Sequence, residues 1–366
     1  MYLSSAYKNA EAISLQTPAL PLPSLALQKN MSDSEKKLIL VIGATGLQGM
    51  PFIKNVLAPL ENGDPAPYAV RALTRDAKSE KAQMIASLGG EVIQGDVTDQ
   101  ECIATALEGC YAVFMNVDTN SVGEQAEIYA AIKTFESSHR VPQMRHFIWS
   151  SLEYYSKYGK YDKQYRAVNY DSKGIVNDWI RAQPHDPSGE GLSWTIINTG
   201  SYYDNLAGAL MGPLPEKDED GNIVFALPCE DGHIPAISLE DIAWWARYCL
   251  DNRDKTSGEE LWVAGENMTI DELTGIFQRA TGLPAVRKRI SVEEYLDHHP
   301  KLTAANREKL AGMFASWRDD LVGRDMEWLY KTHPKTDRLE DWIRKKGYSG
   351  ILASSTDAKR YRTHWR

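Results

Sequence analysis

The chain has 366 residues, 43% of them hydrophobic and 25% charged, which is close to the average of globular proteins. This composition excludes collagen-like, coiled-coil and mainly disordered chains. The 41 Lys and Arg residues against 50 Asp and Glu residues give a formal net charge of -9, and an acidic surface repels the phosphate backbone of nucleic acids. We therefore expect a soluble folded protein of about two domains that binds no nucleic acid.

The first 36 residues lack the features of a targeting or membrane segment. Their most apolar stretch, 19–27, is interrupted by two prolines, and the chain has no apolar run of roughly 18 residues. Arginine and a small-residue cleavage pattern are missing from the leader, which argues against signal and transit peptides. We interpret 1–36 as a disordered extension of a cytoplasmic protein without membrane contact. The four cysteines are widely spaced, which predicts neither disulfides nor a metal site: Cys102, Cys110, Cys229 and Cys249.

Apolar strand-like runs alternate with helix-like segments over the first half of the chain. The branched run 38–42 is typical of a strand buried on both faces of a parallel sheet. Further strands are predicted over 68–74, 91–94, 111–115, 145–150 and 192–198. Helices are predicted over 47–60, 79–88, 100–107, 124–137 and 170–181. This alternation predicts an α/β fold with a Rossmann-like, doubly wound parallel sheet.

The pattern loosens after residue 205. A Gly- and Pro-rich stretch, 212–215, and the acidic stretch 216–221 mark a loop or boundary. We assign 206–350 to a smaller mixed α/β region, interleaved with the sheet in sequence, which covers the carboxyl ends of the strands where ligands of such sheets bind. Residues 351–366 form a basic tail. Short elements of the smaller region are predicted over 241–250, 261–264, 270–281 and 292–297.

A glycine-rich turn, Gly43-Ala44-Thr45-Gly46-Leu47-Gln48-Gly49, follows the first strand and opens a helix. Glycines at these positions permit a tight turn and a close approach of the backbone to a pyrophosphate, and the helix N-terminus supplies free N–H donors. The alternative is a turn with a purely structural role. Because strand, turn, helix and second strand stand in the required order, the motif favours dinucleotide binding. We therefore interpret 37–205 as an NAD(P)-binding Rossmann domain.

Three charged residues stand where such a domain meets its dinucleotide. Arg75 ends the second strand, where an arginine suits the 2′-phosphate of NADP; Asp76 beside it could hold an NAD ribose or pair with Arg75 on the surface. Asp96 follows the third strand and could accept hydrogen bonds from the adenine amino group or cap the next helix. Lys173, on the helix after the fifth strand, would reach the nicotinamide ribose or is an exposed helix lysine.

Taken together, these residues give the chain a family resemblance. Over about residues 38–350 the chain resembles the NmrA-like family of atypical short-chain dehydrogenases/reductases, which is common in fungi. The resemblance rests on the turn GATGLQG and on the segments 73–76, 95–96, 146–151, 171–173 and 202–206. The resemblance implies bound NADP(H). The residues that it implies as cofactor ligands are Gly43, Thr45, Gly46, Gln48, Gly49, Arg75, Asp96, Val97, Val117, Asp118, Thr119, Lys173, Tyr203 and Asn205.

The chain departs from the usual catalytic pair of short-chain dehydrogenases. That pair is Tyr-x-x-x-Lys on one helix face, where the lysine lowers the tyrosine pKa so that the hydroxyl can shuttle a proton. Four residues before Lys173 stands Asn169, while Tyr170 is three residues away on a shared face. Ser151 ends the fifth strand, the usual place of a substrate-orienting hydroxyl. The catalytic candidates are therefore Lys173, Ser151 and Tyr170.

Three functions from different classes follow. The first is an NADPH-dependent reductase of a small organic carbonyl or imine, with fungal secondary metabolism as its setting. The second is a non-catalytic, dinucleotide-sensing transcriptional regulator that binds a protein partner, and a non-catalytic scaffold is a third. Asn169 favours the regulator, whereas the tyrosines around the expected cleft are compatible with a substrate pocket: Tyr154, Tyr155, Tyr202 and Tyr203.

Overall fold

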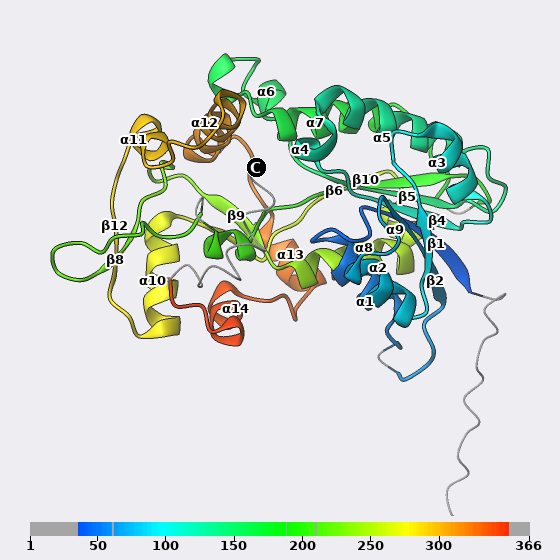
Figure 1. Cartoon of the computed structure of the whole chain (residues 1–366), viewed down its shortest axis with the longest axis horizontal. Coiled ribbons are helices and arrows are strands. Elements are labelled where there is room, and N and C mark those ends of the chain that lie inside the picture. The colour runs from blue at the N-terminus through cyan, green and yellow to red at the C-terminus, as the bar shows by residue number, and fades with distance from the viewer. Residues whose placement is uncertain (1–35, 61, 188, 209–210, 351–366) are drawn as a thin grey trace, which may run out of the picture. The chain divides into compact units, whose positions relative to one another are not determined.

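The computed structural model describes residues 36–60, 62–187, 189–208 and 211–350 (Figure 1). The N-terminal extension predicted from the sequence lies outside these residues, apart from residue 36. The basic tail predicted over 351–366 lies outside them as well.

The largest sheet of the described residues has seven strands in the order β10-β6-β5-β4-β1-β2-β3, and every neighbouring pair is parallel. β1 lies between β2 and β4, so the strand order reverses there. The strands are β1 Lys37–Ile42, β2 Tyr68–Thr74, β3 Glu91–Gln94, β4 Ala112–Met115, β5 His146–Ser151, β6 Ser193–Asn198 and β10 Glu259–Trp262. This arrangement confirms the predicted Rossmann-like parallel sheet.

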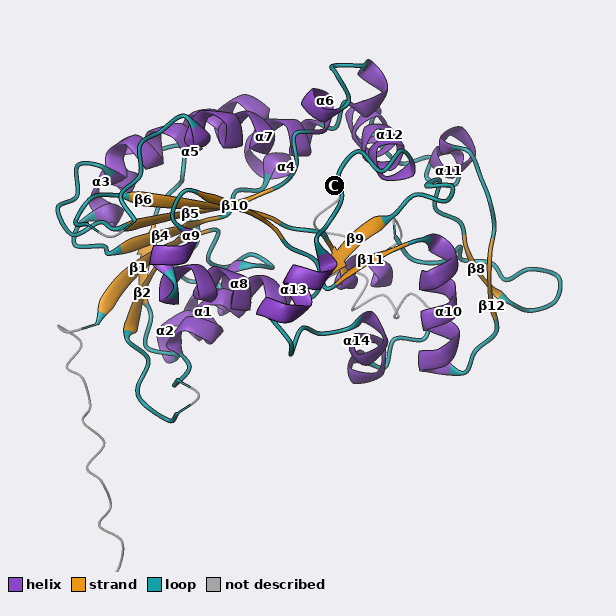
Figure 2. Cartoon of the chain, turned by 180° about the vertical axis from the view of Figure 1, so that it is seen from behind, coloured by secondary structure: helices purple, strands orange, loops and turns teal. Residues whose placement is uncertain are grey.

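Helices cover both faces of this sheet (Figures 1 and 2). Side chains alternate between the two faces of a strand, so Ile39 and Val41 of β1 join one apolar core while Leu40 and Ile42 join the other. Each core is closed by its own layer of helices, which makes the fold doubly wound. The first layer is α1 Gly49–Leu57, α2 Glu80–Ser87 and α8 Leu239–Asp251; the second is α3 Gln100–Leu107, α5 Glu124–Ser138 and α7 Val168–Arg181.

A second group of elements lies beyond the carboxyl ends of the strands, around a separate apolar core (Figure 2). Its strands are β7 Ser201–Tyr202, β9 Ile234–Ile237 and β11 Glu266–Met268 in one small sheet, and β8 Ile223–Phe225 with β12 Ala285–Arg287 in another. Its longer helices are α10 Ile270–Thr281, α11 Val292–Asp297, α12 Ala304–Arg318 and α14 Leu339–Lys346. Helix α13, Met326–Thr332, packs through Leu329 on the main-sheet core that contains α1 and α8. Short helical segments are α4 Thr119–Val122, α6 Tyr155–Tyr158, η2 Lys163–Tyr165, η3 Tyr203–Ala207 and α9 Arg253–Thr256.

Two segments differ from the sequence-based assignment. We expected 241–250 and 261–264 to belong to the smaller region, but α8 packs on the main-sheet core and β10 pairs with β6 as its seventh strand. The buried face of α8 includes Trp245, which shares a core with Phe52 of α1. Periodicity predicts which face of an element is apolar, and it carries no information about which partner covers that face.

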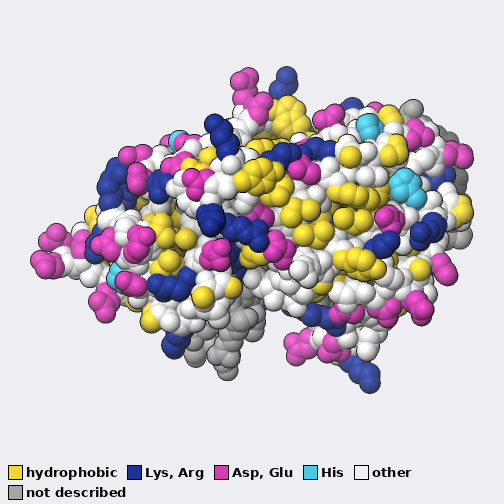
Figure 3. All heavy atoms as spheres, turned by 90° about the horizontal axis from the view of Figure 1, so that it is seen from above, with side chains coloured by type: hydrophobic (Ala, Val, Ile, Leu, Met, Phe, Trp, Pro, Cys, Tyr) yellow, Lys and Arg dark blue, Asp and Glu magenta, His cyan; other side chains and the backbone are white. Residues whose placement is uncertain are grey.

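The surface of the described residues carries charges of both signs. On the face seen in Figure 3, Lys and Arg side chains are interspersed with Asp and Glu side chains, and apolar side chains lie between them. Tyr129 and Tyr161 are among the large exposed apolar residues. Apolar residues scattered in this way are ordinary on protein surfaces and do not by themselves mark a contact site.

Candidate functional site

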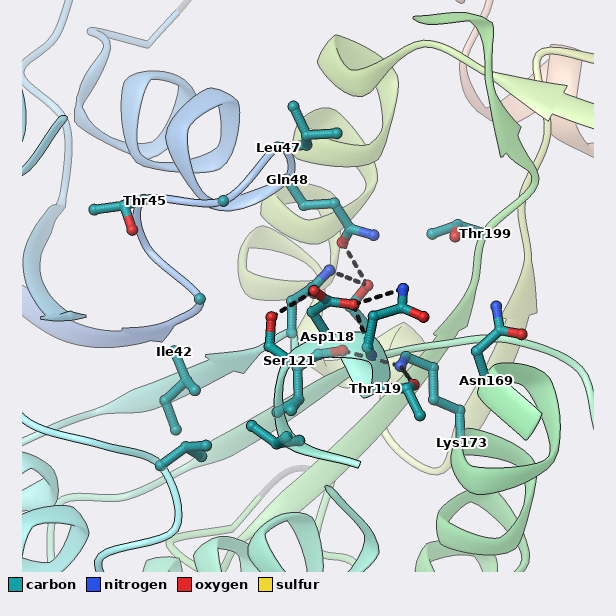
Figure 4. Close-up of a pocket in the computed structure, with 18 of the residues that line it drawn as sticks. Ile42, Thr45, Leu47, Gln48, Asp118, Thr119, Ser121, Asn169, Lys173 and Thr199 are labelled. Carbon is teal, nitrogen blue, oxygen red and sulfur yellow. Dashed lines mark hydrogen bonds between the residues drawn. The ribbon is translucent and has the colours of Figure 1, made fainter. Parts of the chain in front are cut away.

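A cavity of about 580 Å³ lies where the strand order of the main sheet reverses. It is lined by the glycine turn after β1, by the segments that follow β2 to β6, and by residues of α7 and α12. Figure 4 shows Gln48, Asp118, Lys173 and Asn169 arranged around this space. A crevice at the carboxyl ends of parallel strands, at such a reversal, is the usual ligand site of open α/β sheets.

The glycine turn forms a cradle of bare backbone. Gly43 has φ +80°, and an added Cβ would overlap the carbonyl oxygen of Asn116. No side chain caps α1, and the N–H groups of residues 47–49 have no acceptor within the described part of the chain. Gly49 does not line the cavity, since it packs closely on the Gly43 carbonyl. A ligand contact by Gly49 therefore stays a prediction, whereas Gly43 and the uncapped helix end face the cavity.

Two cations lie beyond the end of β2. Arg75 is exposed, lines the cavity, and has no hydrogen-bond or ion-pair partner among the described residues. Lys81 on α2 donates to the carbonyl of Thr45 at 2.9 Å, which brings a second cation to the glycine turn. The Asp76 carboxylate accepts from the N–H of Lys78 at 2.9 Å instead of pairing with Arg75. Lys81 is not among the residues predicted from the sequence, although its place in the first turn of the helix after the strand is a signal for it.

Asp96 lines the cavity beside Val97, after β3. Hydrogen bonds to its carboxylate from the hydroxyl and the N–H of Thr98, at 2.7 and 2.9 Å, lower the pKa of Asp96. Asp99, not Asp96, caps α3. Of the two roles predicted for Asp96, the helix cap is thus taken by another residue.

Lys173 is buried and paired, not an exposed helix lysine. Its ammonium donates to a carboxylate oxygen of Glu127, to the Val117 carbonyl at 2.9 Å and to the Thr119 hydroxyl at 3.3 Å. Glu127, which is fully buried, also accepts from Thr119 and Ser172 at 2.5 and 2.7 Å. An ammonium has three donor hydrogens, so all are committed to the loop after β4 and to α5. The sequence analysis did not identify Glu127.

The two remaining catalytic candidates, Ser151 and Tyr170, are not arranged for proton transfer. Ser151 donates to Asn177 of α7 at 2.6 Å. Tyr170 lines the cavity but stacks on Tyr155 with ring centroids 4.3 Å apart, and burial raises the pKa of Tyr170. The Tyr-x-x-x-Lys pair requires the opposite shift. The Asn169 amide lines the cavity at the position that the catalytic tyrosine would occupy.

A chain of hydrogen bonds crosses the cavity from β4 to β7. Asn116 donates to Ser150 at 3.4 Å, Ser150 donates to Gln48 at 2.5 Å, and Gln48 donates to the Tyr202 hydroxyl at 2.7 Å. Tyr202 lines the cavity, whereas the neighbouring Tyr203 is fully buried outside it and donates to a backbone carbonyl at 3.2 Å. The structure therefore gives the predicted contact by Tyr203 no support, because adjacent residues at this strand end face opposite sides.

The part of the cavity opposite the glycine turn is largely apolar. Asn205, a predicted cofactor ligand, lines the cavity and donates to Ser201 at 3.0 Å. Helix α12 covers this part, although it lies far from the other lining segments in the sequence. The apolar lining residues are Leu152, Tyr170, Met211, Leu310 and Met313.

Several known proteins of similar sequence come from fungi. Over 219 residues the chain is 36% identical to the NmrA-like family domain-containing oxidoreductase ptmS of Penicillium ochrochloron, covering 56% of this chain and 61% of that protein. Over 224 residues it is 27% identical to the oxidoreductase notA′ of Aspergillus versicolor, covering 58% and 59%. The match thus spans about three fifths of the length of these relatives.

Solved structures share the fold. NmrA, a negative transcriptional regulator in complex with NADP, superposes with a TM-score of 0.67 at 21% identity, over 85% of this chain and 95% of that one. An NADPH-dependent quinone oxidoreductase from Escherichia coli gives 0.63 at 18% identity, over 84% and 99%. At such identities the likeness shows the fold alone.

The described residues contain no helix long and apolar enough to cross a membrane, and within the same residues no group of three or more His, Cys, Asp or Glu side chains is placed to hold a metal.

The sequence model of the NmrA-like family matches residues 35–343. This match confirms the resemblance inferred from the motifs. The chain belongs to the NmrA-like family.

Proposed function

We propose that the chain binds NADP(H) in this cavity and uses it to reduce a small organic carbonyl or imine. The observation that carries the proposal is the cradle of bare glycine backbone and uncapped α1 N-terminus, with Arg75 and Lys81 beside it. Free N–H groups at a helix N-terminus suit a pyrophosphate. Two cations at the end of β2 suit the additional phosphate that distinguishes NADP from NAD.

Different residues of the chain would contact different parts of the dinucleotide. The N–H groups of Leu47 and Gln48 would hold the pyrophosphate, and Arg75 and Lys81 the 2′-phosphate. Asp96 and Val97 would border the adenine. The Lys173–Glu127 pair would hold the loop 117–119 in place against the ribose. Bound NADPH would supply the hydride, while the apolar end of the cavity would bind the substrate and exclude water.

A regulator without turnover is the second candidate. Asn169 in place of the catalytic tyrosine, the committed ammonium of Lys173 and the buried Tyr170 support it. The names of the curated relatives as oxidoreductases support the reductase, as does the apolar lining of one part of the cavity. A fungal biosynthetic setting is part of the reductase proposal, and a protein partner is part of the alternative.

One experiment separates the two. The purified chain is titrated with NADPH and NADH by fluorescence, and NADPH oxidation is then followed by absorbance with a panel of ketones, enones and imines. Binding with substrate-dependent oxidation is the expected result. Tight NADPH binding without oxidation of any compound, together with a dinucleotide-dependent protein complex, would favour the regulator. Failure to bind either dinucleotide would refute both.

A further inference from the structure

The hydrogen-bond chain across the cavity has a direction and an unused end. Asn116 donates to Ser150, so the Ser150 hydrogen is free to reach Gln48, whose amide nitrogen in turn donates to Tyr202. The Tyr202 oxygen therefore acts as an acceptor from Gln48. A phenol also has one hydrogen to donate, and no acceptor for it exists within the described part of the chain. The chain ends in an uncommitted O–H donor.

This donor lies in the cavity, where its oxygen is 2.7 Å from the Gln48 amide nitrogen. Tyr202 and Asn205 both line the cavity, one on β7 and the other directly after. Tyr170 of α7 and Asp118, after β4, line the same cavity. Burial raises the pKa of Tyr202, so the group stays protonated at neutral pH.

Two of the catalytic candidates predicted from the sequence are already committed as donors, whereas Asn169 and Thr199 also line the cavity. The ammonium of Lys173 has three protein acceptors, and the hydroxyl of Ser151 donates to Asn177. A ligand atom that accepts hydrogen bonds would gain a partner in Tyr202. A ligand that covers Tyr202 without such an atom would leave the hydroxyl hydrogen without an acceptor, which is unfavourable.

We propose that Tyr202 is the specificity-determining donor of the substrate end. It donates a hydrogen bond to the carbonyl oxygen or imine nitrogen of a substrate whose apolar body packs on Leu152, Met211, Leu310 and Met313. This inference rests on the proposed function, because it requires a cavity that holds NADP(H) and substrate together. The donor comes from β7, and not from the helix α7 that carries the tyrosine in short-chain dehydrogenases.

Binding to the NADP⁺ complex, in which no reduction occurs, tests the inference. Two probes of the same shape are compared by calorimetry: 2-acetylnaphthalene, which has a carbonyl oxygen, and 2-isopropylnaphthalene, which has none. The wild-type complex is expected to prefer the ketone. Tyr202→Phe should weaken ketone binding about 5- to 10-fold, the effect of one neutral hydrogen bond, and leave the hydrocarbon unchanged.

Two further variants sharpen the result. Tyr203→Phe is the matched control, because it removes a hydroxyl outside the cavity, and ketone binding should be unchanged. Gln48→Glu replaces the amide donor by a carboxylate that accepts the Tyr202 hydrogen, so the ketone preference should fall with the tyrosine in place. The melting temperature of each variant is measured to confirm folding.

Three outcomes would overturn the inference. They are unchanged ketone binding in Tyr202→Phe, equal loss for both probes, and no ketone binding to the wild-type NADP⁺ complex. Equal loss would indicate that Tyr202 only packs against the ligand. Titration with NADP⁺ alone comes first, and its failure would refute the proposed function instead.

Discussion

Removing one partner of the Lys173–Glu127 pair should destabilise the fold strongly. Lys173 is 7% exposed and Glu127 is fully buried, so water cannot replace the lost partner. Breaking a buried ion pair from one side costs roughly 3–5 kcal/mol. In Lys173→Met, Glu127 keeps hydrogen bonds from Thr119 and Ser172, which places the expected loss near the lower value, about 3 kcal/mol. The melting temperature should fall by about 6 °C in a domain of this size.

The assay is a double-mutant cycle in urea and by thermal melting, with Lys173→Met, Glu127→Gln and the double variant. Because each single variant leaves one charge buried and unpaired, the double variant should lose less than the sum, with a coupling of about 1–3 kcal/mol. Lys133→Met is the control, since that lysine pairs with Glu136 on the exposed face of α5 and such pairs contribute little.

The cycle also addresses catalysis. If the ammonium only holds the loop after β4, Lys173→Met should weaken NADPH binding in proportion to the loosened loop. A positioned acid would instead contribute at least about 100-fold to kcat. Single variants as stable as wild type, with additive effects, would refute the buried pair and return Lys173 to an ordinary helix lysine.

Three other outcomes are expected. Arg75→Ala should weaken NADPH binding by roughly 1.5–3 kcal/mol, the range for a hydrogen bond to a charged group, and leave NADH binding unchanged. Lys78→Ala, in the same loop but outside the cavity, is the control. Equal loss of affinity for both dinucleotides would remove Arg75 from the phosphate site. Gly43→Ala should lower both the melting temperature and dinucleotide affinity, because the Cβ would overlap the Asn116 carbonyl at positive φ; an unchanged melting curve would contradict the turn geometry. Burial lowers the pKa of Lys309 to about 8 from 10.5, so the unfolded chain binds more protons than the folded one between these values, and stability should rise with pH there. The melting temperature of the wild type relative to that of Lys309→Met should be higher at pH 10 than at pH 7. A difference that stays constant between the two pH values would count against the shift.

Much of the main sheet follows from the sequence because its signals are local. Branched apolar runs and helical periodicity give strand and helix positions that agree with the structure within one to three residues at most boundaries, as at β2, Tyr68–Thr74, and α10, Ile270–Thr281. The glycine turn is equally local, since its need for bare backbone arises from a few neighbouring residues. Site residues that follow directly on a strand, such as Arg75 and Asp96, could therefore be identified without a structure.

What only the tertiary structure decided concerns residues far apart in the chain. Lys173 and Glu127 are separated by 46 positions and Gln48 and Tyr202 by 154, and no pattern in either segment announces the partner. The same holds for β10, whose apolar run fits either sheet, and for α12, which brings Leu310 and Met313 to the cavity. The choice between Tyr202 and Tyr203 depends on which way one short strand faces. Local sequence sets the conformation and the apolar face of an element, whereas the contacts that give a buried polar side chain its role exist only after the elements have packed.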